Sequence, residues 1–225
     1  FLNLKNQMDI KKVIRRNDFR FNKRFGQNFI EDGALLNKIA DFAEVKKTDC
    51  VLEIGVGAGT LTKVLAQRAK KVVGYEIDKN LRPILSETLS GVENAEVVFK
   101  DFMKESVSEI NSCFGEDFIV VANLPYYITS PITMRHLEDF PLCKRIVIMV
   151  QKEVALRFTA NCGTKDYGAI TASIDYYGDA TYGFTVDRTN FYPAPNVDSA
   201  VVRIDRNSKY LVKSEDAFKK TLTVA

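Results

Sequence analysis

The chain has 225 residues, of which 46% are hydrophobic and 27% charged, so it can bury a sizeable core and is not expected to be disordered. No apolar run approaches the roughly 18 residues that span a membrane, and no signal-peptide pattern opens the chain. A single histidine and four cysteines without a CxxC pair argue against a His-rich metal site, a zinc knuckle or a disulfide framework. We therefore expect a cytoplasmic protein that binds neither a membrane nor a metal.

The net charge of +3 is unevenly distributed along the chain. Residues 1–24 contain eight Lys or Arg residues against Asp9 and Asp18, a net charge of +6, which leaves the other 201 residues with a net charge of −3. We interpret residues 1–24 as a basic N-terminal extension that contacts a polyanion. A solvated terminus without a partner is the alternative interpretation.

Helical and strand patterns alternate after this segment. A first helix is expected at Ala34–Ala43, whose apolar residues fall on one face. The β-rich runs that follow are Cys50–Ile54, Lys71–Glu76, Glu96–Lys100, Phe118–Asn123 and Arg145–Gln151. The helical patterns between them are Thr60–Arg68, Lys79–Leu89, Met103–Ser112 and Ile132–Glu138. This alternation predicts an α/β fold in which helices cover both faces of a mostly parallel sheet.

The last part of the chain departs from this alternation. Two further strands, Thr181–Val186 and Ala200–Asp205, are separated by the proline-containing loop Phe191–Asn196 and not by a long helix. We therefore expect a seven-stranded sheet with an antiparallel end, built by residues 25–206. Residues 207–225 carry an amphipathic pattern without a partner, which we interpret as the start of a truncated C-terminal helical region.

A glycine-rich turn with the pattern ExGxGxG follows the first strand. It runs from Glu53 to Gly59 and includes Gly55 and Gly57, and glycines at such a turn let a ligand approach the main chain. The dinucleotide fingerprint GxGxxG requires a glycine at position 60, where this chain has Thr60. A nicotinamide-linked dehydrogenase is therefore disfavoured, and the turn instead resembles the first motif of S-adenosylmethionine-dependent methyltransferases. A purely structural turn is the alternative.

Two carboxylates end the next two strands. Glu76 lies 21 residues after Gly55, a spacing at which an acidic residue commonly accepts hydrogen bonds from ribose hydroxyls. Asp101 can accept the exocyclic amine of an adenine, or can simply cap a helix. Ile77 and Phe102, which follow these carboxylates, complete the predicted nucleoside site at the carboxyl ends of the strands.

The fourth strand leads into Asn123, Leu124, Pro125 and Tyr126. The Asn123 side-chain oxygen and the Leu124 carbonyl can both accept hydrogens from the N6 amine of adenine, which localises the nitrogen lone pair for methyl transfer. Pro125 fixes the turn, and Tyr126 offers a face on which the base can stack. No general base is needed, because the methylated ammonium loses its proton to water. The alternative is a structural turn with a core tyrosine.

These motifs together resemble the rRNA adenine N6,N6-dimethyltransferases of the KsgA/RsmA type, which act on small-subunit rRNA. The resemblance extends from Phe25 to Arg203 and includes two more motifs, at Phe25–Ile30 and Phe191–Val201. It implies a Rossmann-like methyltransferase fold, S-adenosylmethionine as cofactor, rRNA of the immature small ribosomal subunit as partner, and a role in ribosome biogenesis. Nothing in the sequence demands more than a monomer, which is the oligomeric state that we expect. The residues it assigns to the cofactor pocket are Asn28, Ile30, Gly55, Gly57, Gly59, Glu76, Asp101 and Asn123. Phe191 is implied to sandwich the target adenine against Tyr126.

Two other functions share this scaffold. The related Erm methyltransferases dimethylate adenine in large-subunit rRNA, but the segments Asn123–Pro131 and Val197–Val201 are more similar to the KsgA type. A non-catalytic RNA-binding assembly factor is the other alternative. The intact residues Glu76, Asp101, Asn123 and Tyr126 are evidence against lost catalysis.

Overall fold

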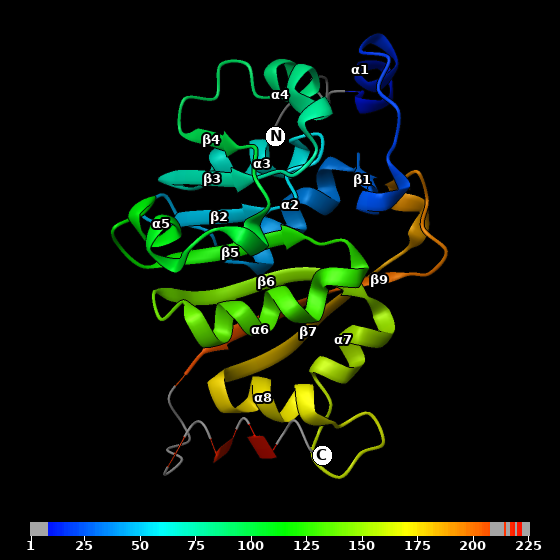
Figure 1. Ribbon diagram of the computed structural model, residues 1–225. Coiled ribbons are helices and arrows are strands. Elements are labelled where there is room, and N and C mark those ends of the chain that lie inside the picture. The colour runs from blue at the N-terminus through cyan, green and yellow to red at the C-terminus, as the bar shows by residue number, and fades with distance from the viewer. Residues whose placement is uncertain (1–8, 208–213, 215–216, 219, 222–225) are drawn as a thin grey trace.

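The structure, a computed structural model, describes residues 9–207, 214, 217–218 and 220–221. Its main sheet has the strand order β4-β3-β2-β5-β6-β9-β7 (Figure 1). The four pairings from β4 to β6 are parallel, whereas β9 pairs antiparallel with both β6 and β7. The strands are β2 (Cys50–Ile54), β3 (Lys71–Tyr75), β4 (Ala95–Val98), β5 (Phe118–Asn123), β6 (Cys143–Gln151), β7 (Gly178–Val186) and β9 (Ser199–Arg206). The predicted mostly parallel sheet of seven strands with an antiparallel end is confirmed.

Helices cover both faces of this sheet, as predicted (Figure 1). One face packs against α5 (Val107–Ser112), α6 (Thr129–Asp139), α7 (Lys152–Phe158) and α8 (Ala169–Tyr177). The other face packs against α2 (Gly33–Phe42) and α3 (Thr60–Ala66). Successive side chains of a strand point to opposite faces, so Val51 and Leu52 of β2 enter different hydrophobic clusters. Within the described residues, no helix is long and apolar enough to cross a bilayer.

Two predicted helices are interrupted for local reasons. The stretch Lys79–Leu89 divides into a 3-10 turn, η3 (Lys79–Leu81), and α4 (Arg82–Thr88). Pro83 has no N–H to bond to the carbonyl of Lys79, so one continuous helix cannot form there. The stretch Met103–Ser112 likewise divides into η4 (Phe102–Lys104) and α5, because Ser106 and Glu109 form a capping box that starts a new helix.

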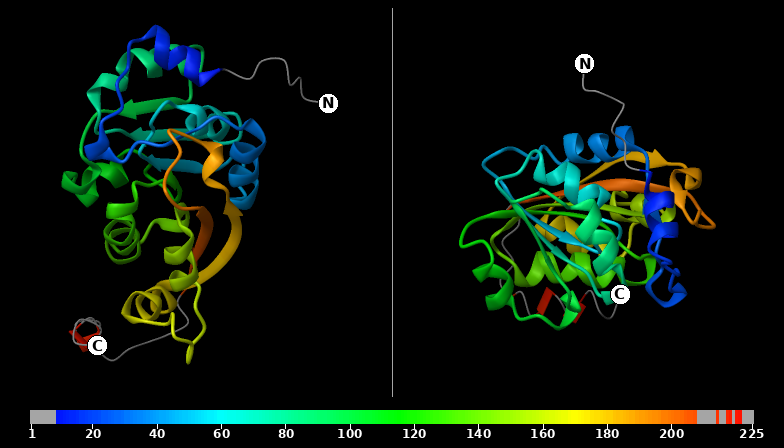
Figure 2. Two further views of the ribbon diagram at one scale, coloured as in Figure 1. Left: turned by 90° about the vertical axis from the view of Figure 1, so that its right-hand side faces the viewer. Right: turned by 90° about the horizontal axis from the view of Figure 1, so that it is seen from above.

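Helix α1 (Ile10–Arg16) lies within the segment that we interpreted as a basic extension, and it packs against the body of the protein. Asp9 caps it by accepting the backbone N–H of Lys12 at 3.1 Å. The buried side chains Ile10, Val13 and Ile14 share a cluster with residues of η3 and α4. Figure 1 and Figure 2 show α1 beside α4, at the opposite end of the molecule from α8. The domain boundary at residue 24 stays a prediction, but α1 is anchored by apolar contacts.

The structure contains a small two-stranded ribbon that was not predicted from the sequence. Strand β1 (Phe29–Ile30) pairs antiparallel with β8 (Phe191–Tyr192), with Ile30 opposite Phe191. The expected loop Phe191–Asn196 therefore begins as a strand. The expected helical region at 207–225 lies mostly outside the described residues, although the Phe218 ring packs on Tyr176 with ring centroids 4.5 Å apart.

Candidate functional site

A cavity of about 390 Å³ lies at the carboxyl ends of β2, β3, β4 and β5. This volume is within the range of small-molecule sites, and the carboxyl edge of an open α/β sheet is where such sites usually form. Thirteen of the fourteen predicted site residues line it: Asn28, Ile30, Gly55, Gly57, Glu76, Ile77, Asp101, Phe102, Asn123, Leu124, Pro125, Tyr126 and Phe191.

Gly59 is the predicted residue that does not line this cavity. It is the N-terminal cap of α3, with φ +79°. A Cβ there would lie 2.8 Å from the Leu85 side chain, so close packing against α4 requires a glycine. Gly59 thus has a packing role in the structure, and its assignment to the cofactor pocket stays a prediction.

The other two loop glycines form a cradle for a ligand. Gly55 and Gly57 have φ of +77° and +57°, a region that favours glycine. A Cβ on Gly57 would lie 3.2 Å from the Phe29 ring of β1. The Gly57 N–H donates to Glu76 Oε2 at 2.8 Å, which fastens the loop to the end of β3.

Glu76 is a buried carboxylate held by the backbone. Its Oε1 accepts the Asp78 N–H at 2.8 Å, while Oε2 accepts the Gly57 N–H. Burial raises the pKa of Glu76, and the two backbone N–H groups oppose this by stabilising the charged form. Each carboxylate oxygen retains a second lone pair, so the group fits the two hydroxyls of a ribose.

The end of β4 supplies a more exposed carboxylate. Asp101 caps η4, where its Oδ1 accepts the Met103 N–H at 3.1 Å, and it lies on the cavity wall. The buried Phe102 ring stacks on His136 at a centroid distance of 5.1 Å. Burial lowers the pKa of His136 to about 4, so this histidine is neutral at physiological pH and packs as part of the core. Phe102 therefore joins the cavity wall to the core beneath it.

Asn123 ends β5, and its side-chain amide has a fixed orientation. Its Nδ2 donates to the backbone carbonyl of Asn28 at 3.1 Å. The donor half of the amide is thereby occupied, and no described residue donates a hydrogen bond to Oδ1. The oxygen is thus the half of the amide that is available as an acceptor at the cavity.

Tyr126 follows Asn123 on a 3-10 turn, η5 (Tyr126–Ile128). Its hydroxyl forms a hydrogen bond of 2.9 Å with the Ser199 hydroxyl at the start of β9. Burial raises the pKa of Tyr126, so the ring stays a neutral phenol at physiological pH. The β1–β8 ribbon brings the buried Phe191 to the same cavity.

Glu53 is the main cavity residue whose role was not foreseen, although it belongs to the glycine-loop motif. It is the penultimate residue of β2 and 1% exposed, and burial, together with the nearby Glu76, raises its pKa to about 8. Within the described part of the chain, its Oε2 has no hydrogen-bond partner. Glu53 is therefore protonated at neutral pH. An acidic residue at the end of an otherwise apolar strand was the available signal.

Other cavity residues could not be recognised from their chemistry in the sequence. Gln27 donates from Nε2 to Asp78 Oδ2 at 2.7 Å, which ties the segment before β1 to the end of β3. The exposed Tyr127 and Met103 line the opening, together with Ile77, which was predicted from the sequence. No hydropathy pattern identifies side chains that act from loops.

Comparisons with known proteins agree with this geometry. The profile of the ribosomal RNA adenine dimethylase family matches residues 18–224. The chain is 46% identical over 209 residues to the proteins named ribosomal RNA small subunit methyltransferase A from Geobacillus sp. (strain WCH70) and Bacillus cytotoxicus, covering 92% of this chain and 72% of each relative.

Solved structures give the same result. A dimethyladenosine transferase from Plasmodium falciparum superposes with a TM-score of 0.77 at 32% identity, covering 87% of this chain and 70% of that one. The 23S rRNA methyltransferase ErmE superposes with a TM-score of 0.74 at 34% identity, covering 87% and 78%. The resemblance seen in the motifs is thus confirmed, and the chain belongs to the ribosomal RNA adenine dimethylases, which are S-adenosylmethionine-dependent methyltransferases.

Proposed function

We propose that this protein dimethylates N6 of adenosines in small-subunit rRNA and so takes part in small-subunit biogenesis. The observation that carries the proposal is the Asn123 amide, whose nitrogen is held by the Asn28 carbonyl and whose oxygen is left to accept a hydrogen at the cavity. The identity of 46% to small-subunit methyltransferases supports the choice of rRNA.

The residues present fit S-adenosylmethionine. Glu76 would hold the ribose hydroxyls, the Gly55–Gly57 turn would accommodate the amino acid portion, and Asp101 with Ile77 would bind the adenine. When bound, this cofactor supplies an electrophilic methyl group. Buried Glu53, protonated at neutral pH, would add no negative charge of its own to the site.

The protein's contribution to transfer is to prepare the amine. Asn123 Oδ1 and the Leu124 carbonyl would each accept one hydrogen of N6, which turns the nitrogen lone pair out of conjugation with the ring. That lone pair would then be free to take the methyl group as the S–C bond of the cofactor breaks and a neutral thioether leaves, and the amine would lose its surplus proton to water. Tyr126, held by Ser199, and Phe191 would enclose the target base between their rings.

The same proposal places the protein on immature small ribosomal particles in the cytoplasm. One chain supplies every residue of the cavity wall described above, so we propose that a monomer is sufficient. Residues 25–206 are the proposed catalytic domain.

The test is nucleoside mass spectrometry after incubating labelled S-adenosylmethionine with small-subunit particles that lack the modification. We expect labelled N6,N6-dimethyladenosine with the wild type and none with Asn123→Ala. Large-subunit particles serve as the control substrate, because ErmE, as its name states, is a 23S rRNA methyltransferase. Label only in large-subunit rRNA would refute the assignment, and the absence of label in both would refute methyl transfer.

A further inference from the structure

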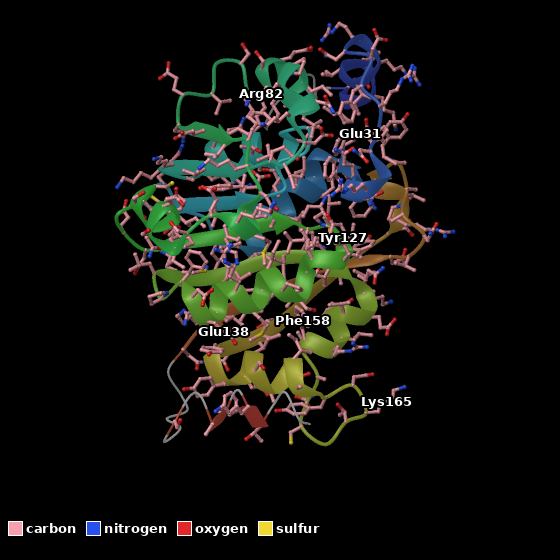
Figure 3. All side chains as sticks on the ribbon, in the orientation of Figure 1. Glu31, Arg82, Tyr127, Glu138, Phe158 and Lys165 are labelled. Atoms are coloured by element: carbon pink, nitrogen blue, oxygen red, sulfur yellow. The ribbon has the colours of Figure 1, made fainter. Side chains whose placement is uncertain are left out.

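Exposed apolar side chains gather at the opening of the cavity. Of the five exposed large hydrophobic residues in the described part of the chain, three line it, and Tyr127 is the most open of them at 63% exposure. The side-chain view in Figure 3 shows Tyr127 where β5 passes into α6, at the carboxyl edge of the sheet. An apolar patch beside a binding cavity indicates a surface that meets a ligand.

The backbone explains why Tyr126 and Tyr127 point in different directions. Both lie on η5, and consecutive side chains of a 3-10 turn are rotated by about 120°. Tyr126 is directed to Ser199, whereas Tyr127 lies over Gly26, where an added Cβ would be 4.0 Å from the ring. Across the described residues, no hydrogen bond or ring contact involves the Tyr127 side chain. Its ring is therefore presented to solvent from a defined turn.

We propose that Tyr127 stacks on the base next to the target adenosine in the RNA, and so helps to set the sequence context of methylation. This inference rests on the proposed function. A target base must leave its stack to reach Asn123. The adjacent base in the RNA then loses its stacking partner and lies at the opening of the cavity. An exposed aromatic face is the usual platform for such an unstacked base.

The charges around the opening fit an RNA strand at this position. Arg24 and Lys100 are exposed residues of the cavity wall. Lys100 is partly neutralised by Glu105 at 2.9 Å, whereas Arg24 has no ion pair within the described chain. Arg24 lines the same cavity as Tyr127 and lies two residues before Gly26, over which the Tyr127 ring lies, so its guanidinium suits the phosphate that follows a stacked base.

Steady-state kinetics with small-subunit particles that lack the modification provide the first test. Tyr127→Ala is expected to raise KM for the particle about fivefold to tenfold, the lower part of the range for one stacking contact. The dissociation constant of the cofactor should be unchanged. Tyr127→Phe, which keeps the ring, should restore the wild-type KM, and Tyr127→Leu, which keeps apolar volume without a π-face, should not. Leu156→Ala removes an equally apolar exposed side chain on α7, outside the cavity wall, and is the matched control.

A double-mutant cycle identifies the partner. The cycle uses particles reconstituted with an abasic nucleotide beside the target. The wild type should bind these particles as weakly as Tyr127→Ala binds the intact particle, and Tyr127→Ala should bind both kinds of particle equally well. A Tyr127→Ala enzyme as good as wild type, rescue by leucine, or additive losses with both neighbouring abasic sites would overturn the proposal. A wild type that methylates no particle would instead refute the proposed function, so the two failures are distinguishable.

Discussion

Replacing Glu53 with glutamine tests whether this buried group is a neutral acid. Glu53 is the penultimate residue of β2 and is 1% exposed, and burial raises its pKa from 4.5 to about 8. Glutamine has nearly the same shape and is uncharged at every pH. The variant therefore removes the titration while leaving the packing of the strand almost unchanged.

The size and sign of the effect follow from proton linkage. Between pH 4.5 and 8 the folded protein keeps a proton on Glu53 that the unfolded chain releases. The contribution of this group to the free energy of unfolding is thus complete below pH 4.5 and falls by about 1.4 kcal/mol per pH unit above it. The loss ends near pH 8 and totals at most roughly 5 kcal/mol.

Urea denaturation at several pH values between 5 and 8.5 measures this contribution. We expect Glu53→Gln to be about as stable as the wild type at pH 5 and more stable by several kcal/mol at pH 8. Glu93→Gln, an exposed carboxylate, should shift neither end of the series. If the difference between wild type and Glu53→Gln is the same at pH 5 and pH 8, Glu53 does not retain its proton in the folded state.

Three further predictions concern the ligands. Asn123→Ala should lower kcat for methyl transfer by about 100-fold or more while changing cofactor affinity far less; single-turnover assays and calorimetry separate the two, and retained activity would contradict the role of the amide. Glu76→Ala should weaken cofactor binding by about 1–3 kcal/mol, because ribose hydroxyls lose their acceptor; an unchanged dissociation constant would place the ribose elsewhere. Arg15→Gln with Arg20→Gln should reduce the salt dependence of RNA affinity by roughly 0.7 per lost phosphate contact, and an identical slope would show that these exposed arginines do not touch RNA.

The parallel sheet could be predicted because β2, β3, β5 and β6 each contain a run of apolar residues. All five residues of β2 are buried, and such a strand is recognisable without knowing its neighbours. The glycine turn, Glu76 and Asn123 were recognisable for a related reason. They follow those strands directly, and parallel strands bring their carboxyl ends to one edge.

The features that escaped prediction depend on contacts distant in sequence. Strand β1 has two residues, too few for any periodicity, and it exists because of β8, about 160 residues later. Charge made the α1 segment resemble a solvated extension, although three of its side chains are buried against η3 and α4. The state of Glu53 could not be foreseen either, since a raised pKa reflects three-dimensional burial and the neighbouring Glu76.

The β1–β8 ribbon has a consequence for how the protein matures during synthesis. Phe191 reaches the cavity only when β8 has paired with β1, where it lies opposite Ile30. The wall of the cavity is therefore incomplete until residue 191 has been synthesised. A ribosome-bound nascent chain that stops before β8 can already contain the glycine turn and Glu76, yet it lacks one side of the binding site. Competence to hold cofactor and base together is therefore acquired only once β8 has been synthesised, after most of the sheet has emerged.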